Sequence, residues 1–411
     1  MNSLLTDVKR LMRFLAGHTH WIVFGRIYAS ALALLLSVFL SRYMPIDMYG
    51  RYQFYISAFF LAGTFSLTAS TNILLKYAAI GHEWSYGIIF KYRLLFAILG
   101  SMALLGWGFF ESAESDAWVF FALALLLPLY HCCDLFEYLL QAQINFKSLN
   151  LKYFVRSTFA LILPIATFLI SGNGALTLLA YVGSISFINL AFYWQSWKSI
   201  KNKKTLNPAL VVSVKRESFF LSLSGVASLV CMHLDRVLVF NHVDPRSLAI
   251  YANGMIVGMA INSLLKNVLG SINGRLAFVK IELWHYFAIF VFGSVLGIVG
   301  AFTMPLVITV LFGTKFSDSA IFSQIVLISL GLYSVSNILY DNTIFGKTSY
   351  MGAIYLNNIL VSVSQLLSLL VIFYIFAGSE YLLIMFASLY PLKAFLGIVI
   401  LVFSKWILTR D

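Results

Sequence analysis

Long apolar segments recur from one end of the sequence to the other, separated by short polar connections. A helix needs about 20 mostly apolar residues to cross the hydrocarbon core of a membrane. Most of the segments meet that length, so we predict about twelve transmembrane helices. Their expected positions are 20–41, 54–75, 88–110, 117–140, 153–171, 175–197, 217–240, 249–275, 283–311, 319–340, 351–377 and 380–403.

The composition excludes a soluble fold. Only 11% of the 411 residues are charged, whereas 61% are hydrophobic. A soluble protein must place polar groups on its exterior, because part of every globular surface stays in water. The expected fold class is therefore an all-α polytopic membrane protein. Cys132, Cys133 and Cys231 lie in apolar runs and show neither metal-ligand spacing nor a disulfide framework.

Lysine and arginine residues indicate which side of the membrane each connection faces. The N-terminal segment lacks the pattern of a cleaved signal peptide, so we place it in the cytoplasm as retained sequence. Most of the 28 lysines and arginines then fall in cytoplasmic segments, and the outer segments hold only Arg42, Arg51, Arg246 and Lys315. This topology explains the net charge of +12 without a nucleic-acid partner. It predicts that both termini are cytoplasmic.

The sequence also predicts an internal repeat. The longest basic connection, a cytoplasmic linker at 198–216, separates an N-terminal six-helix bundle (1–197) from a C-terminal one (217–411). Short stretches match between the halves at offsets of 199 and 200 residues, as the pairs 39–52 with 238–251 and 144–148 with 344–348. Because six is an even number, the halves enter the membrane in the same orientation. We therefore predict a parallel repeat, with a cleft between the bundles where transporters bind substrate.

Polar residues spaced by four support such a cleft. This spacing places them on one face of a helix. The stripe in the first half is Thr64, Thr68, Asn72 and Lys76, and its partners in the second half are Ser263, Asn267, Ser271 and Arg275. Both stripes end in a cation, which favours a substrate cavity. Helix packing by small polar residues is the alternative.

Four further charges fall within predicted spans, where charge is costly and usually faces a bundle interior or a cavity. Arg26 lies close enough to the cytoplasmic boundary to reach water. Asp235 and Arg236 lie near the outer end of their span, where a structural cap is the other interpretation. Lys393 lies in the middle of the last span, just after Pro391. Snorkelling does not explain it, so we predict a functional residue or a buried ion pair.

His131, Asp134 and Glu137 share one side of a predicted helix and suggest a proton relay. Their position near the cytoplasmic end allows simple contact with water instead. No nucleophile–base constellation stands out, and we expect neither enzymatic activity nor a cofactor.

Three stretches carry a family resemblance: 35–58, with a Tyr-Gly turn after the first span; 232–254, with Leu-Asp-Arg followed by Tyr-Ala-Asn; and 140–157, a short basic link. They resemble the polysaccharide biosynthesis and export family, the Wzx-type O-antigen flippases. That family belongs to the MATE-related multidrug/oligosaccharidyl-lipid/polysaccharide exporter superfamily. The likeness covers the whole chain in architecture but is specific only in these short stretches.

The resemblance implies two six-helix bundles in a V shape in the bacterial inner membrane. It implies alternating access and an undecaprenyl-diphosphate-linked oligosaccharide as substrate. Membrane lipid, a polysaccharide polymerase and a chain-length regulator are the further partners it suggests. Lysine and arginine suit the diphosphate, and Ser, Thr and Asn suit sugar hydroxyls. The predicted substrate-binding residues are Arg26, Asn72, Lys76, Asp235, Arg236, Asn267, Arg275 and Lys393.

Other functions compete with this interpretation. A cation-coupled multidrug exporter would also have twelve spans, but a pocket for cationic drugs favours acidic residues, whereas Arg and Lys predominate here. A lipid II flippase shares the cationic cavity but usually carries additional helices. A membrane-embedded glycosyltransferase or polymerase typically needs a large outer loop, and no predicted outer loop exceeds about 15 residues.

Overall fold

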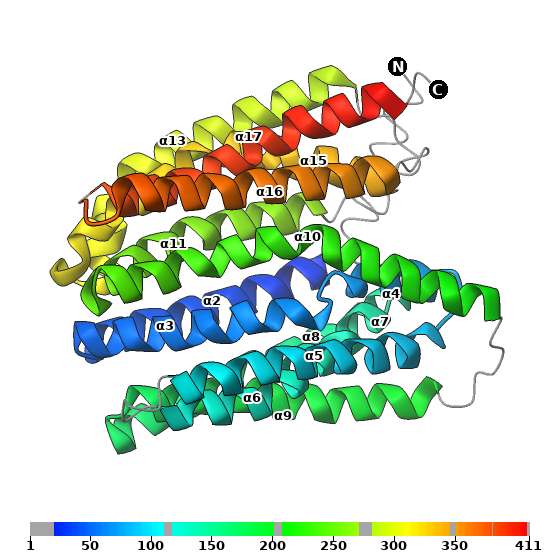
Figure 1. Cartoon of the computed structure of the whole chain (residues 1–411), viewed down its shortest axis with the longest axis horizontal. Coiled ribbons are helices and arrows are strands. Elements are labelled where there is room, and N and C mark those ends of the chain that lie inside the picture. Colours follow the sequence, from blue (N-terminus) through cyan, green and yellow to red (C-terminus); the bar gives the residue numbers. More distant parts are fainter. Residues whose placement is uncertain are drawn as a thin grey trace.

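The computed structural model describes residues 20–110, 117–200, 208–270, 282–345, 351–379 and 381–408, and these are almost entirely helical, with no strand among them (Figure 1). The N-terminal half contains α2 (His20–Tyr43), α3 (Ile46–Gly63), η2 (Thr64–Ser66), α4 (Ser70–Ala79), α5 (Ser85–Phe110), α6 (Ala117–Cys132), η3 (Cys133–Leu135), α7 (Phe136–Ala142), α8 (Phe146–Ser171) and α9 (Gly174–Ile200). The C-terminal half contains α10 (Pro208–His242), α11 (Pro245–Gly270), α13 (Leu283–Phe312), η4 (Thr314–Ser319), α14 (Ala320–Ile328), α15 (Leu330–Phe345), α16 (Met351–Phe376) and α17 (Leu382–Leu408).

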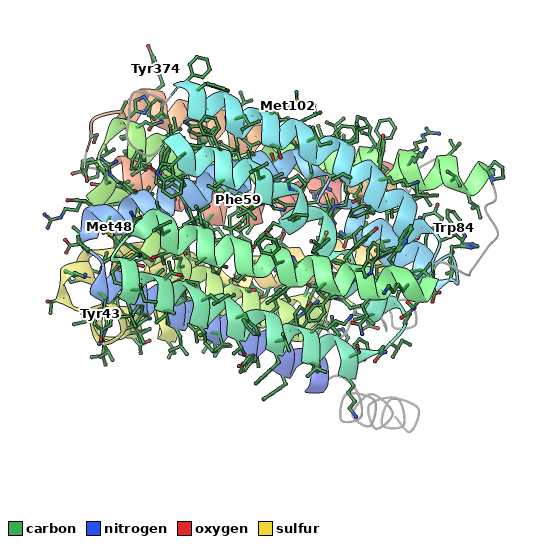
Figure 2. The ribbon with its side chains drawn as sticks, turned by 90° about the horizontal axis from the view of Figure 1, so that it is seen from below. Tyr43, Met48, Phe59, Trp84, Met102 and Tyr374 are labelled. Atoms are coloured by element: carbon green, nitrogen blue, oxygen red, sulfur yellow. The ribbon has the colours of Figure 1, made fainter. Side chains whose placement is uncertain are left out.

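The predicted number of spans is confirmed. Ten of the described helices are long and apolar enough to cross a membrane, and two bent helix pairs bring the total to twelve if each pair is one span. Large apolar side chains cover the outside, as expected where lipid is the solvent. Met102 is 61% exposed and Tyr374 is 88% exposed, whereas Phe59 is fully buried (Figure 2). The chain is a multi-pass membrane protein.

The two halves pack their helices in the same pattern, as a parallel repeat requires. In the first half α2 packs on α8, α5 on α6, and α8 on α9. In the second half the corresponding helices pair in the same way: α10 packs on α16, α13 on α14 and α15, and α16 on α17. Figure 1 shows the bundles side by side, with α2, α3, α10 and α11 between them.

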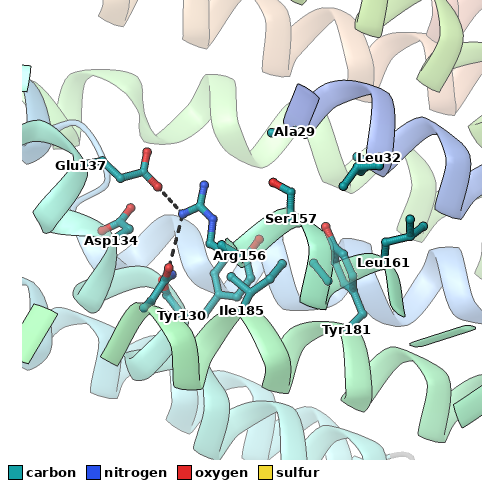
Figure 3. Close-up of a pocket in the computed structure, with 13 residues that line it drawn as sticks. Ala29, Leu32, Tyr130, Asp134, Glu137, Arg156, Ser157, Leu161, Tyr181 and Ile185 are labelled. Carbon is teal, nitrogen blue, oxygen red and sulfur yellow. Dashed lines mark hydrogen bonds and ion pairs between the residues drawn. The ribbon is translucent and has the colours of Figure 1, made fainter. Parts of the chain in front are cut away.

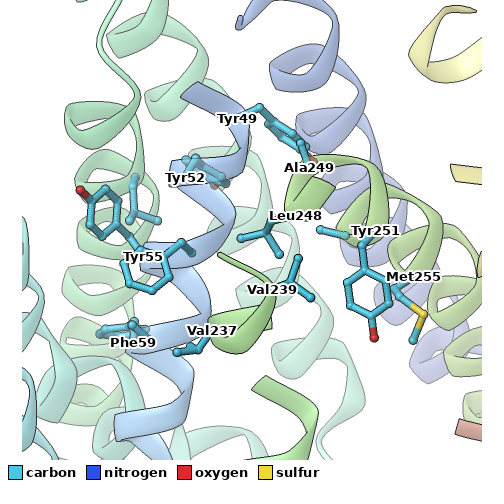
Figure 4. Close-up of a cluster of buried hydrophobic side chains, with 14 of the residues drawn as sticks. Tyr49, Tyr52, Tyr55, Phe59, Val237, Val239, Leu248, Ala249, Tyr251 and Met255 are labelled. Atoms are coloured by element: carbon cyan, nitrogen blue, oxygen red, sulfur yellow. The ribbon is translucent and has the colours of Figure 1, made fainter. Parts of the chain in front are cut away.

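The bundles meet tightly at one end of the molecule, where α2 and α10 end and α3 and α11 begin. We call this the closed end; it lies at the left of Figure 1. The Tyr49 hydroxyl donates to Asn253 Oδ1 at 2.8 Å, and Phe54 stacks on Phe240 with ring centroids 4.0 Å apart. Gly50 is required there because a Cβ would lie 1.9 Å from the Pro245 carbonyl oxygen. Figure 4 shows the buried apolar cluster that fills this interface.

Two cations predicted to lie in outer segments tie the bundles together at the closed end. Arg42 on α2 donates through Nε to the Leu311 carbonyl at 2.7 Å and through Nη2 to the Val310 carbonyl. In the other direction, Lys315 Nζ donates to the carbonyls of Arg42 and Met44, both at 3.2 Å. Each cation caps carbonyls at the end of a helix in the opposite bundle, where positive charge is favoured.

Two spans are broken, which the sequence analysis did not predict. The second span bends by 50° between Ser66 and Ser70, and the tenth bends by 45° at Ser329. Leu67 takes a left-handed conformation with φ of 52° in the first break. Hydroxyl groups compete there for backbone carbonyls, as in Ser66 Oγ to the Gly63 carbonyl at 2.5 Å. Broken helices are tolerated at membrane depth where they are buried in protein or border a cavity.

The predicted basic linker is shorter than expected. Helix α9 continues to Ile200 and α10 already begins at Pro208, so most of 198–216 is helical and 201–207 lie outside the described residues. Helix α10 has 35 residues, or about 52 Å at about 1.5 Å per residue. It therefore extends well beyond a hydrocarbon core of about 30 Å.

Candidate functional site

A cavity of about 450 Å³ lies between the bundles, away from the closed end. The first half contributes Thr68 and Ala69 in the break of the second span, Thr71 and Asn72 on α4, and Tyr138 on α7. The second half contributes α10, α11, α15, α16 and α17. The polar residues of the lining are Thr68, Thr71, Asn72, Tyr138, Ser222, Ser228, Lys266, Tyr333, Ser336, Asn337, Tyr340, Asn357, Asn358, Ser362 and Lys393.

Two lysines give this cavity its charge. Lys393 Nζ donates to Ser228 Oγ at 2.5 Å, and Ser228 in turn donates to Gln365 Oε1 at 3.2 Å. Lys266 lines the cavity from α11 and is exposed. No Asp or Glu occurs among the described lining residues, and no described carboxylate lies within 4.0 Å of either ammonium group. The cavity is therefore suited to an anionic ligand, which would supply the missing counter-charge.

The neutral part of the lining offers many hydrogen-bonding groups. Asn358 Nδ2 donates to Tyr340 at 3.2 Å and, more weakly, to Ser224 at 3.4 Å. Asn357 Oδ1 and Ser222 Oγ are buried and have no hydrogen-bond partner among the described residues. Buried polar atoms are nearly always satisfied, so these two atoms remain available to a ligand or water. Hydroxyl and carboxamide groups of this kind suit a polyhydroxylated ligand.

Of the residues that the sequence predicted to bind substrate, the structure places some in the cavity lining and others outside it. Asn72 and Lys393 line the cavity. Lys76 instead forms an ion pair with Glu217 at 2.9 Å, and Tyr77 donates to the same carboxylate at 2.9 Å. Lys266 was not among the predicted site residues, although its charge within a polar stretch of the eighth span was a usable signal.

The remaining predicted residues lie elsewhere or cannot be placed. Asp235 is buried and accepts from the Tyr251 hydroxyl at 2.5 Å, away from the cavity, and Arg236 follows it on α10. Arg26 is half-buried on α2, which packs on α8. Arg275 and the side chain of Asn267 lie outside the described residues.

A second, smaller cavity of about 310 Å³ lies inside the N-terminal bundle (Figure 3). Its two acidic lining residues are each paired with an arginine. Asp134 pairs with Arg93 at 2.9 Å, and Glu137 pairs with Arg156 and accepts from the Tyr153 hydroxyl at 2.7 Å. Arg156 also reaches Asn189 Oδ1 at 3.3 Å. These ion pairs hold η3 and α7 against α5 and α8.

His131 does not join this network. Its imidazole stacks on Phe59 with ring centroids 5.5 Å apart, and it occupies the space left by Gly63, where a Cβ would lie 2.2 Å from Nε2. The proposed relay of His131, Asp134 and Glu137 is thus not a continuous hydrogen-bonded chain among the described residues. No group of three or more His, Cys, Asp or Glu side chains suited to a metal ion occurs among them either.

Comparison with known proteins shows that this chain resembles solved structures in its fold. The sequence matches no family model and no curated relative. The structure is similar to the lipid II flippase MurJ in an inward closed conformation, with a TM-score of 0.66 and 12% identity over 93% of this chain and 87% of that chain. It is similar to a MATE transporter, VcmN, from Vibrio cholerae, with a TM-score of 0.63 and 13% identity over 99% of both chains.

The structure is also similar to that of an inward-facing multidrug resistance MATE transporter of the MOP superfamily. That comparison has a TM-score of 0.61 and 11% identity over 93% of this chain and 95% of that chain. Identities this low are informative about architecture alone. The predicted fold class is confirmed: the chain has the all-helical fold shared by these flippases and transporters.

Proposed function

We propose that the protein is a flippase that moves an undecaprenyl-diphosphate-linked oligosaccharide, such as an O-antigen repeat unit, from the cytoplasmic to the periplasmic leaflet. The observation that carries the proposal is the pair Lys266 and Lys393 in an interbundle cavity whose described lining has no carboxylate. A diphosphate is the counter-ion that two lysines suit, through charge-assisted hydrogen bonds. The likeness to a lipid II flippase supports it at the level of fold.

The uncharged polar residues of the cavity suit the oligosaccharide of such a substrate. Sugar hydroxyls need donors and acceptors when they leave water, since unmet polar groups are costly in a low-dielectric interior. Asn72, Asn337, Asn357 and Ser222 supply them around the lysines. The lipid tail stays in the bilayer, so only the headgroup needs a polar path. The glycan polymerase and chain-length regulator would act after the headgroup has crossed.

The direction of transport follows from the proposed orientation. With the basic connections inside, the closed end faces the periplasm and the cavity lies toward the cytoplasm, where a lipid-linked precursor is assembled. Opening then requires the contacts of Arg42, Tyr49 and Lys315 to separate as the bundles rock. Reporter fusions at Glu114 and Lys201 should report opposite sides of the membrane, and the same side for both would refute the orientation.

The decisive experiment measures flipping of a lipid-linked oligosaccharide in proteoliposomes. We expect Lys393→Ala and Lys266→Ala each to lower the rate, and the double variant to abolish it. Lys198→Ala is the matched control, because that lysine is exposed on α9 and is not among the lining residues of the cavity. Unchanged flipping by the double variant at normal abundance would overturn the proposal.

The alternative is a cation-coupled multidrug exporter, or an exporter of another lipid-linked substrate. The likeness to MATE transporters supports it equally at the level of fold. A cationic drug, however, would enter a cavity that already holds two lysines and no described carboxylate. Efflux of cationic dyes by the wild-type protein, lost in the Lys393→Ala variant, would favour this alternative.

A further inference from the structure

A groove on the outer surface of the N-terminal bundle lies between α2 and the first part of α8. It has a volume of about 490 Å³ and shares no lining residue with the interbundle cavity. Helix α2 ends at the closed end, and so does α8, because Gly174, just after it, packs against Met48 near the start of α3. Both helices therefore begin at the opposite end of the molecule, and the groove lies there.

The wall of the groove is apolar and faces outward. Phe24 and Tyr28 of α2 are four residues apart, and Leu151 and Phe154 of α8 are three apart, so each pair lies on one face of its helix. Phe24 is 62% exposed and Leu151 65% exposed, which leaves them free to contact lipid. Tyr28 stacks on Phe154 with ring centroids 4.5 Å apart. These two rings form the end of the groove nearer the membrane centre.

The opposite end of the groove is polar and positively charged. Asn145 caps α8 by accepting a hydrogen bond from the Ser148 amide at 3.3 Å, which places Lys147 in the first turn. Lys147 is the one charged residue among the described residues that line the groove. It is exposed, and no described carboxylate lies within 4.0 Å of its ammonium group. An anion at this end would meet a cation that has no internal partner.

The charge and the apolar wall follow one another along α8. Lys147, Leu151 and Phe154 are spaced by four and three residues, so they share one face of the helix. From Lys147 to Phe154 the helix rises by about 10 Å, at about 1.5 Å per residue. A ligand that fills the groove therefore has a negative group at one end and an apolar chain at the other.

A second outward-facing groove of the same volume provides a comparison within the molecule. It lies on the C-terminal bundle between α13, α15 and α17, and its described lining includes Phe287 and Phe290 but no charged residue. That groove fits an acyl chain of any lipid. The groove between α2 and α8 differs because Lys147 can select the headgroup as well.

We propose that the α2–α8 groove binds one anionic phospholipid of the cytoplasmic leaflet, with its phosphate at Lys147 and one acyl chain along Leu151 and Phe154. With the basic connections inside, Lys147 lies at the level of the headgroups and the apolar wall extends toward the membrane centre. A lysine near the membrane surface favours anionic lipids, and fixed aromatic rings pack against the chain. The lipid contacts helices of one bundle only, so it can stay bound while the bundles rock.

Photocrosslinking in nanodiscs of equimolar phosphatidylglycerol and phosphatidylcholine tests this site. The photoreactive residue p-benzoylphenylalanine replaces Phe154 or, as a matched control, Phe159 on the same helix. Both side chains are 48% exposed, but only Phe154 lines the groove. We expect the ratio of phosphatidylglycerol to phosphatidylcholine adducts to be about fivefold higher at 154 than at 159, the scale for one lysine at an anionic surface. Equal ratios at the two positions would overturn the proposal.

Charge variants assign the preference to a residue. Lys147→Ala should lower the ratio at 154 to that at 159, and Lys147→Arg should keep it high. Lys91→Ala is the control, because Lys91 is exposed on α5 and does not line the groove. A high ratio at 154 that survives Lys147→Ala would contradict the site. The same probe at Phe287, in the uncharged groove, should show a ratio close to that at 159.

The probe at 154 also detects other occupants. Undecaprenyl diphosphate, added at the concentration of phosphatidylglycerol, should leave the phosphatidylglycerol adducts at 154 unchanged, because we place that substrate in the interbundle cavity. Displacement of those adducts would make the groove a substrate site instead. An adduct between residue 154 and the N-terminal segment 1–19, in place of lipid adducts, would show that the chain itself fills the groove. Either result would overturn the proposal and leave the proposed function standing.

Discussion

The two bundles share one fold but treat buried charge in opposite ways. In the N-terminal bundle Arg93 and Arg156 face Asp134 and Glu137, so these four side chains carry no net charge together. In the C-terminal bundle Lys393 has a serine hydroxyl as its hydrogen-bond partner and no carboxylate within 4.0 Å among the described residues.

Paired charges of this kind stabilise the fold, whereas an unpaired cation is available to bind an anionic ligand. An ion pair satisfied within one bundle holds its helices together, and removal of one partner leaves the other charge buried. A lysine without an internal counter-ion contributes little to stability and attracts an external anion. Removing one partner of an ion pair should therefore lower stability, whereas removing the lysine without an internal counter-ion should lower transport and leave stability intact.

The largest expected effect is on stability in the N-terminal bundle. Arg156→Ala should lower the free energy of unfolding by about 3–5 kcal/mol, because Glu137, whose side chain is only 13% exposed, would lose its partner. Denaturant titration in detergent micelles would measure the change. The double variant Arg156→Met with Glu137→Leu should recover most of the loss. A single variant as stable as the wild type would show that the pair contributes nothing to the fold.

The C-terminal bundle should respond in the opposite way. Lys393→Met removes a charge without a described counter-ion, so we expect the unfolding free energy to stay constant or rise. Flipping should fall by about 10–100-fold, corresponding to the loss of a charged hydrogen bond of about 1.5–3 kcal/mol. Lys393→Arg should retain part of the activity. A strong loss of stability in Lys393→Met would place this lysine among the structural charges instead.

A substitution at the closed end should have an effect of intermediate size on the conformational equilibrium. Tyr49→Phe removes the donor to Asn253 and leaves a buried amide oxygen unpaired only while this end is closed, at a cost of about 1–3 kcal/mol. The conformational equilibrium should shift toward opening by about fivefold or more. A cysteine introduced at Ala249, buried in the closed-end cluster, would then react faster with maleimide. Tyr43→Phe is the control, since Tyr43 is 65% exposed at the same end, and equal rates in both variants would contradict the prediction.

The smallest effect is expected for Lys76→Ala. Its ion pair with Glu217 is partly exposed, with Lys76 49% and Glu217 25% exposed, and such pairs contribute about 0–1 kcal/mol. Flipping should change by less than about fivefold. A loss as large as that of Lys393→Met would mean that Lys76 leaves Glu217 to bind substrate during transport, as the polar stripe suggested.

The spans were predictable because apolar length is a local property of the chain. The expected helix at 20–41 corresponds to α2 at His20–Tyr43, and that at 283–311 to α13 at Leu283–Phe312. The break at Leu67 was not predictable, since Thr64, Ser66 and Ser70 are compatible with a continuous helix. In the structure the Thr64 and Ser66 hydroxyls donate to carbonyls three residues earlier, and Arg93 Nε, from another helix, donates to the Ser66 carbonyl at 3.3 Å.

Three features follow from the residues alone: the all-helical membrane fold, the division into matching halves and the presence of a mid-span cation at Lys393. Apolar length, repeat offset and residue identity need no knowledge of neighbours in space. The packing of the helices was needed to show that Lys76 pairs with Glu217, that Arg156 pairs with Glu137, and that Lys266 and Lys393 line one cavity. The strength of an interaction between charges depends on distance and burial, and both are set by helices far apart in the chain.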